Sequence, residues 1–166
     1  LCLTRPDDMT AIHRRYLEAG ADIIETNTFG ASRVGMDEFN MPLEMVVGIN
    51  AAAVKCARIA CEEFAEKTPD KPRFIAGSIG PTTKQTAIST SVEDASYRAV
   101  TFHEMADSYY AQVKALVEAG VDILMPETAI DTLNLKACLF AIQQYFEDSG
   151  NRVPVMVSAT FDTGGG

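Results

Sequence analysis

The sequence predicts an α/β fold, and more specifically part of a (β/α)8 barrel with parallel strands. The first observation is a repeated phrase: EAGADIIET at Glu18–Thr26 returns as EAGVDILMPET at Glu118–Thr128. Each copy runs from the end of an amphipathic helix through a glycine into a β-rich run, which is one αβ unit. The second observation is that a predicted helix separates every predicted strand from the next, so the sheet is expected to be parallel.

The predicted strands are short runs rich in Val, Ile or Phe, as expected for parallel strands buried on both faces. They are expected at residues 21–26, 73–78, 121–127 and 153–161. Four such strands do not close a barrel, which needs eight, so the sequence predicts barrel strands 2–5 with their helices. Residues 1–166 are therefore expected to form a single partial barrel domain, truncated at both ends. A flavodoxin-like open sheet is the alternative, but the loop after the first strand lacks the glycine-rich phosphate-binding sequence of that fold.

Four helices are expected from apolar periodicity and from residues typical of helix ends. They are expected at residues 6–20, 43–66, 101–120 and 131–147. The motifs Thr4-x-x-Asp7 and Thr101-x-x-Glu104 are interpreted as capping boxes at two helix starts. Gly20 and Gly120 are expected just after helix ends, where a left-handed backbone conformation is needed.

Composition excludes several classes of partner. The formal net charge is −9, from 14 basic and 23 acidic residues, which argues against nucleic acids and anionic membranes. No apolar run approaches the roughly 18–20 residues that span a bilayer, and the first residues lack the pattern of a secretory signal. The four cysteines follow neither a disulfide-framework nor a zinc-knuckle spacing, so a reducing, cytoplasmic location is expected.

The repeated phrase also separates structural from functional acids. Asp22 and Asp122 lie at strand starts, which stabilise a parallel barrel, and are interpreted as structural. Glu25 and Glu127 lie at strand ends, and the two extra residues of the second phrase keep both on the same face. Glu127 is thereby expected about 6–7 Å further out, at the barrel mouth, where it can meet the ammonium group of a ligand. Glu25 is expected one layer deeper, as a hydrogen-bonded structural anchor.

Four segments in this order, GADIIETNTFGAS, AGSIGPT, GVDILMPETAIDTLNLKACLFAI and VPVMVSATFD, resemble the homocysteine-binding domain of cobalamin-dependent methionine synthases. The resemblance covers essentially the whole chain. The wider homocysteine S-methyltransferase family, which includes betaine-dependent enzymes, is similar but more distant. The resemblance implies a (β/α)8 barrel that transfers a methyl group from methylcobalamin, recharged from 5-methyltetrahydrofolate, to the zinc-bound thiolate of homocysteine, giving methionine. Zinc coordination deprotonates a thiol whose free pKa is near 8.5.

The resemblance places substrate-binding residues at the strand ends. Glu127 matches the family's acid that holds the amino group of homocysteine. The other matches lie in neighbouring loops and strand ends: Thr26, Asn27, Thr28, Gly80, Pro81, Thr82, Ser158 and Thr160. The catalytic residues remain unassigned.

The resemblance places the family's zinc cysteines in an N-C segment and a G-G-C-C segment beyond Gly166, so no metal ligand is expected in this chain. Cys56 and Cys61 are five residues apart on one predicted helix, about 140° around its axis, which does not suit a shared metal. Cys2 and Cys138 are interpreted as small packing or neutral residues. Zinc and methylcobalamin are expected in the full-length family enzyme, and neither is expected to bind this chain tightly.

The implied partners are homocysteine and the folate- and cobalamin-binding domains of the same polypeptide. The isolated chain is expected to lack methyl-transfer activity. One alternative is a fragment of an enzyme that uses betaine or a methylsulfonium donor, although the E-T-N-T-F block favours the cobalamin-dependent branch. A second alternative is a non-catalytic binding or self-associating module, because a partial barrel has two unpaired strand edges.

Overall fold

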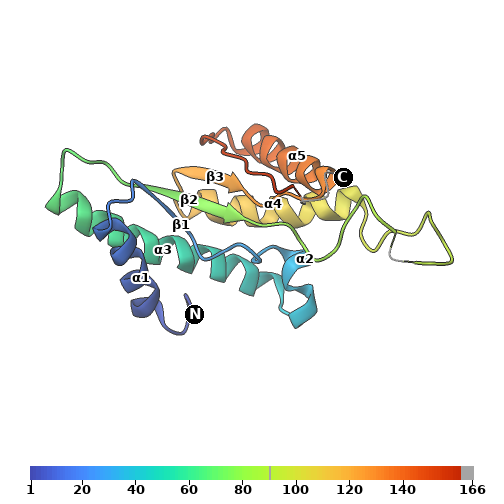
Figure 1. Cartoon of the computed structure of the whole chain (residues 1–166), viewed down its shortest axis with the longest axis horizontal. Coiled ribbons are helices and arrows are strands. Elements are labelled where there is room, and N and C mark those ends of the chain that lie inside the picture. Colours follow the sequence, from blue (N-terminus) through green and yellow to red (C-terminus); the bar gives the residue numbers. More distant parts are fainter. Residues whose placement is uncertain (90, 162–166) are drawn as a thin grey trace.

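The fold is a parallel sheet whose strands are connected by helices (Figure 1). The computed structural model describes residues 1–89 and 91–161. Its elements are α1 (Pro6–Glu18), β1 (Ile23–Glu25), α2 (Arg33–Met36), the 3-10 helix η1 (Asp37–Phe39), α3 (Leu43–Lys67), β2 (Phe74–Ile79), α4 (Phe102–Glu118), β3 (Ile123–Pro126) and α5 (Thr132–Ser149). The strands pair in the order β1-β2-β3, with Ile24 beside Ile75 and Gly77 beside Leu124. The predicted α/β class and parallel pairing are confirmed.

The predicted fourth strand lies beside β3 but pairs with it irregularly. Val155 forms a parallel bridge with Leu124, and Ala159 forms another with Ala129, so the register shifts by one residue between the two bridges. Pro126 also has no N–H to donate to a ladder. The prediction of a full strand at residues 153–161 is therefore wrong: this segment is extended and parallel to β3, but it is held by isolated bridges.

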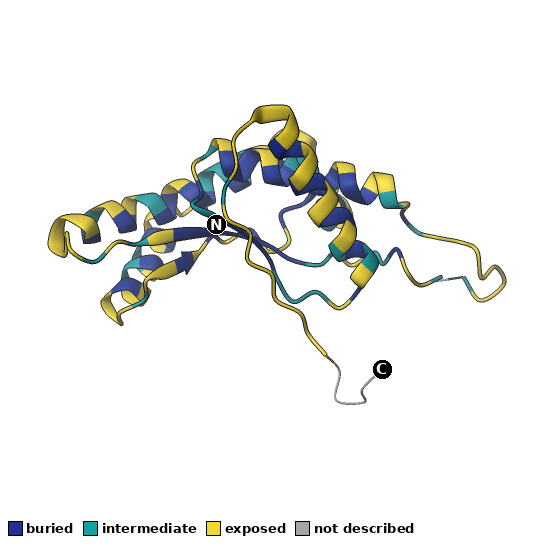
Figure 2. Cartoon of the chain, turned by 90° about the horizontal axis from the view of Figure 1, so that it is seen from above, coloured by how far each residue is buried: buried dark blue, intermediate teal, exposed yellow. Residues whose placement is uncertain are grey.

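One face of the sheet packs against the helices and forms the main core. Ile24, Ile75 and Leu124 share this face and are buried. Figure 2 shows the buried residues concentrated where helices and strands meet, with exposed residues on the outer sides of the helices. On the opposite face, Ile23 and Phe74 are 42% and 41% exposed. Helices thus cover one face of the sheet. On the other face the starts of β1 and β2 are exposed, whereas Ala76, Ser78 and Met125 are buried.

Local sequence signals set most helix ends. Thr101 and Glu104 form the predicted capping box of α4, and Gly20 and Gly120 have the predicted left-handed conformation, with φ of 103° and 95°. The prediction of a capping box at Thr4-x-x-Asp7 is wrong. The N-cap of α1 is Arg5, which makes no side-chain cap, because Pro6 is the first residue of the helix. The N–H groups of Thr4 and Arg5, just before the helix, donate instead to the carbonyl of Leu1.

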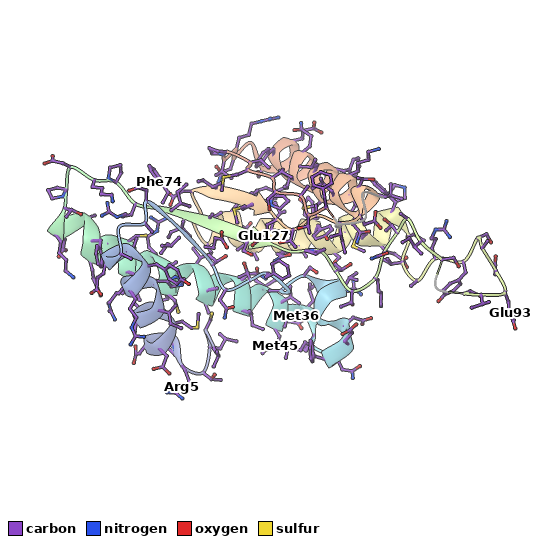
Figure 3. All side chains as sticks on the ribbon, viewed as in Figure 1. Arg5, Met36, Met45, Phe74, Glu93 and Glu127 are labelled. Atoms are coloured by element: carbon purple, nitrogen blue, oxygen red, sulfur yellow. The ribbon has the colours of Figure 1, made fainter. Side chains whose placement is uncertain are left out.

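Long loops leave the carboxyl ends of the first two strands. The loop after β1 carries the short helices α2 and η1. The loop between β2 and α4 projects away from the sheet, with Glu93 near its tip (Figures 1 and 3). Within the described residues, no helix is both long enough and apolar enough to cross a membrane.

Candidate functional site

Glu127 directly follows β3 and is joined to β2 (Figure 3). Its N–H donates to the carbonyl of Ile79 over 3.0 Å. Its Oε1 accepts a hydrogen bond from the hydroxyl of Ser78, which is buried. Glu127 itself is half-buried, and its Oε2 has no hydrogen-bond partner among the described residues. The result is an oriented carboxylate at the carboxyl end of the sheet, with one oxygen available to a ligand.

A small cavity lies directly beside this carboxylate. Gly80, Pro81 and Glu127 line it, together with Asp131 and Asn134 from the start of α5. Its volume of about 20 Å³ can hold a water molecule but not an amino-acid substrate. The structure therefore brings three of the predicted site residues together around a small, mainly apolar hollow. Any larger ligand has to lie outside this hollow, on the open side of Glu127.

Gly80 occupies a position where a side chain would collide with the loop after β1. A Cβ built at this residue would lie 2.7 Å from atoms of the Phe29 ring, which real Cβ contacts essentially never show. The N–H of Gly80 also donates to the carbonyl of Phe29 over 2.8 Å. Glycine thus allows the loops after β1 and β2 to meet at the edge of the site.

Thr26 and Thr28 are buried and tie the ends of β1 and β2 together. Their hydroxyl oxygens lie 2.6 Å apart. The hydroxyl of Thr28 donates to the carbonyl of Ser78 over 2.7 Å, and the N–H of Ser78 donates to Thr26 Oγ1 over 3.1 Å. Both threonines therefore hold the residue that orients Glu127, and they are positioned to act through Ser78.

The predicted residues of the fourth segment lie on the other side of Glu127. Ser158 is exposed, and its Oγ accepts a hydrogen bond from the N–H of Thr128 over 3.0 Å. Thr128 has a φ of 56°, which is uncommon for a β-branched residue. The N–H of Thr160 donates to the carbonyl of Ala129 over 3.1 Å. Ser158 and Thr160 thus border the chain just after Glu127.

Two predicted residues point away from Glu127. The amide of Asn27 lies 3.7 Å from Cys2 Sγ and 3.9 Å from Met9 Sδ, so it faces the beginning of the chain. Thr82 is buried, and its hydroxyl donates to the carbonyl of Lys84 over 2.6 Å, which stabilises the loop after β2. The structure does not bring either side chain to the Glu127 carboxylate.

Glu25 lies on the same sheet face as Ser78 and Glu127, but the expectation of a hydrogen-bonded anchor is wrong. Glu25 is exposed, and its carboxylate has no hydrogen-bond partner among the described residues. Partial burial of the carboxyl group raises the pKa of Glu25, and the charge of Glu127 raises it further. The two carboxylates are therefore close enough to repel each other on the open face of the sheet.

The strand-start acids have the structural roles expected of them. The Asp122 carboxylate accepts a hydrogen bond from the N–H of Ile75 over 2.8 Å and pairs with Arg58 at 3.1 Å. Asp22 pairs with Lys71 at 3.0 Å. These contacts lie at the amino ends of the strands, away from the Glu127 site.

Three polar residues of the site were missed from the sequence. Ser78 orients Glu127, and strand parity could have identified it, because it shares the face of Glu127. Asp131 was assigned only to a helix start, yet it accepts the N–H of Ala87 over 3.0 Å. Asn134 Oδ1 accepts the N–H and hydroxyl of Thr86. Asp131 and Asn134 both fix the loop after β2, and only tertiary packing reveals this.

The cysteines do not form a metal centre in this part of the chain. Cys2 and Cys56 share one small buried cluster, whereas Cys61 and Cys138 belong to the main core. Among residues 1–89 and 91–161, no three His, Cys, Asp or Glu side chains are grouped as a metal ion would require. The donor set present here therefore does not fit a three-cysteine zinc site.

The architecture is similar to that of solved homocysteine methyltransferases. The metallated form of the homocysteine methyltransferase MmuM from Escherichia coli superposes with a TM-score of 0.72 and 22% identity, over 87% of this chain and 50% of that chain. The oxidized form of MmuM gives 0.73 and 21%, over 95% of this chain and 52% of the other. The apo form gives 0.69 and 23%, over 94% and 50%. The chain thus spans about half the length of these structures.

The family assignment rests on the sequence itself. Residues 1–165 match the sequence model of the homocysteine S-methyltransferases, which is nearly the entire chain. The likeness to the solved structures supports the same architecture independently, since it follows the backbone at low identity. This chain belongs to the homocysteine S-methyltransferase family.

Proposed function

We propose that this chain forms the homocysteine-binding part of a homocysteine S-methyltransferase. The observation that carries the proposal is the Ser78–Glu127 pair at the carboxyl end of the sheet. A carboxylate held in one orientation, with a second oxygen available, suits a charge-assisted hydrogen bond from an ammonium group. Homocysteine carries such an ammonium group, and membership of the family supports this class of substrate.

The residues of this chain bind and orient the substrate. Glu127 accepts hydrogen bonds from the ammonium group. Because Ser78 already holds the carboxylate in place, little side-chain conformational entropy is lost when the substrate binds. Gly80 and Pro81 lie beside the carboxylate, around the hollow that is too small for the substrate, and so bound the site on that side. The remaining predicted residues hold or border the strand ends and loops around this position: Thr26, Asn27, Thr28, Thr82, Ser158 and Thr160.

Residues 1–166 are, under this proposal, a single part of a (β/α)8 barrel, comprising barrel strands 2–5. Within the described residues, no strand pairs with the outer edge of β1. A cavity of about 450 Å³ lies between that edge and α1. His13 lines it and is only 5% exposed, yet its Nε2 has no hydrogen-bond partner among the described residues. A further parallel strand would fill this space, and the double length of the similar structures supports it.

In this proposal, the residues that bind zinc are not supplied by this chain. The family chemistry needs the thiol of homocysteine as a thiolate, which zinc coordination provides. The described cysteines do not converge in a set of three. The family resemblance implies that the zinc ligands lie in N-C and G-G-C-C segments of a longer polypeptide, and in this proposal residues 1–166 hold the amino-acid end of the substrate.

The proposed methyl donor is methylcobalamin, recharged from 5-methyltetrahydrofolate by other domains of the same polypeptide. The E-T-N-T-F sequence that begins at Glu25 supports this branch of the family over donors such as betaine or a methylsulfonium compound. The four free cysteines are in keeping with a reducing, cytoplasmic setting. The product would be methionine.

The test is the activity of the longer polypeptide encoded around this segment. Methionine formation from homocysteine is measured with methylcobalamin, betaine or a methylsulfonium compound as the donor. We expect turnover with methylcobalamin and none from the isolated 166-residue chain. Turnover with only another donor would reassign the branch. Absence of homocysteine binding to the zinc-loaded polypeptide would overturn the proposed function.

A further inference from the structure

Cys2 and Cys56 form a buried thiol pair that is separate from the candidate substrate site. Cys2 lies in the turn before α1, and Cys56 lies on α3. They are 5% and 2% exposed and share a small cluster with Met9 and Ala53. Both thiols are free. The cluster therefore joins the first turn of the chain to its longest helix.

The two thiols are close neighbours within this cluster. Burial raises the pKa of the Cys56 thiol most strongly, and the adjacent Cys2 thiol raises it further. Cys2 Sγ also lies 3.7 Å from the amide of Asn27, just after β1. The turn that carries Cys2 is held by hydrogen bonds from the N–H groups of Thr4 and Arg5 to the carbonyl of Leu1. A turn held by these two hydrogen bonds opens locally more easily than a buried helix.

We propose that Cys2 and Cys56 form a reversible disulfide by exchange with a small-molecule disulfide such as oxidised glutathione. The thiolate of Cys2 attacks one sulfur of oxidised glutathione, forming a mixed disulfide and releasing one glutathione thiolate, which takes up a proton. Cys56 then loses its proton and displaces the second glutathione. The two protein thiols are oxidised together, and one molecule of oxidised glutathione is reduced to two of glutathione.

The geometry makes this pairing selective among the four cysteines. Cys56 and Cys61 are separated by about 7.5 Å of rise along the same helix, and Cα atoms more than about 7 Å apart cannot be bridged without backbone movement. Cys61 and Cys138 lie in the main core, apart from the Cys2 cluster.

The bond would connect the turn before α1 to α3, beside Asn27. The disulfide would close the whole segment between Cys2 and Cys56 into a loop, which restricts the unfolded chain strongly. Formation of the bond is therefore expected to raise Tm by about 5–10 °C. The thiol pair does not depend on homocysteine binding. Its formation can therefore be tested on the 166-residue chain even if the proposed function fails.

The experiment treats the reduced, folded chain with glutathione buffers of increasing oxidation and follows intact mass and Tm. We expect loss of two hydrogen masses, a single Cys2–Cys56 linked peptide after digestion, and reversal by excess reduced glutathione. Cys56→Ala is expected to stop at one glutathione adduct on Cys2. The matched control Cys61→Ala, on the same helix, should still close.

Two outcomes would overturn the proposal. One is a folded wild-type chain that remains reduced, or carries only glutathione adducts, in the most oxidising buffer. The other is a linked peptide joining a different pair of cysteines. If Cys56→Ala fails to fold, Cys2→Ala provides the complementary test, because it should neither close nor show the rise in Tm.

Discussion

The hydroxyl of Ser78 donates a hydrogen bond to Glu127 Oε1, and this bond joins the carboxyl ends of β2 and β3. Ser78 pairs in register with Met125, two residues before Glu127, so both polar side chains lie on the face away from the helices. The bond fixes one carboxylate oxygen and leaves Oε2 free among the described residues. The pair is thus arranged to present a negative charge at the open end of the sheet.

Replacing Glu127 by Gln is expected to weaken homocysteine binding by the longer polypeptide. The substitution keeps the size of the side chain and removes its charge. Losing one side of a charge-assisted contact typically costs about 1.5–3 kcal/mol, or about 10- to 150-fold in Kd. Isothermal titration with homocysteine measures the change. Glu66→Gln, the same substitution at an exposed position on α3, is the matched control and should leave Kd unchanged. Equal Kd values for both variants would contradict the role of Glu127.

The repulsion between Glu25 and Glu127 gives a pH prediction. Partial burial and the Glu127 charge raise the pKa of Glu25 above its unfolded value. Between the unfolded and the folded pKa of Glu25, the folded chain therefore binds more protons than the unfolded chain. Its stability falls as pH rises from the unfolded value of about 4.3 through the folded pKa. Glu25→Gln removes this loss, so its free energy of unfolding should increase relative to wild type over that interval.

Urea denaturation between about pH 4 and pH 7 tests this, and carbon NMR titration of the carboxyl groups gives the pKa directly. Glu127→Gln should lower the pKa of Glu25, because it removes the neighbouring charge. A Glu25 pKa that does not move in this variant would show that the two carboxylates are not coupled.

Gly77→Ala should destabilise the chain by about 1–3 kcal/mol through overpacking. A Cβ at this position in β2 would lie 3.1 Å from Leu116 Cδ1 and 3.2 Å from Val121 Cγ1, and all three positions are in or beside the main core. Gly48→Ala, on α3, is the matched control. Nothing lies within 4 Å of its Cβ, and alanine favours a helix, so this variant should be neutral or more stable. Equal urea midpoints for the two variants would refute the packing argument.

The capping box of α4 should contribute about 1 kcal/mol, so Thr101→Ala is expected to lower the free energy of unfolding by about that amount. Hydrogen bonds from the backbone N–H and the hydroxyl of Thr101 lower the pKa of Glu104. A lowered folded-state pKa means that this stabilisation is present above the unfolded pKa of about 4.3 and is lost as pH falls through the folded pKa.

Glu104→Gln separates the hydrogen bonds from the charge, because glutamine also completes a capping box. This variant should stay close to wild type at pH 7 and lose less stability on acidification. Denaturant titrations at neutral and acidic pH provide the comparison. An identical acid response in wild type and Glu104→Gln would show that this carboxylate does not contribute through its titration.

Local signals allowed much of the fold to be predicted. Gly20 and Gly120 identified helix ends because few other residues adopt their positive φ. The alternation along each strand placed Glu127 at a strand end, on the same face as Glu25, and it directly follows β3. Long-range contacts could not be predicted in the same way. Thr26 and Thr28 were expected at the substrate site, but the sequence did not indicate that their hydroxyls hydrogen-bond with Ser78, a residue about fifty positions away.

The sequence by itself determined the order of helices and strands, their parallel pairing and the family, because these depend on periodicity, helix-end residues and motifs read along the chain. Only the tertiary structure decided which polar side chain orients Glu127, that Glu25 is exposed, and that the final segment pairs irregularly with β3. It also brought Cys2 beside Cys56. These outcomes depend on register and packing between distant segments, which no local pattern encodes.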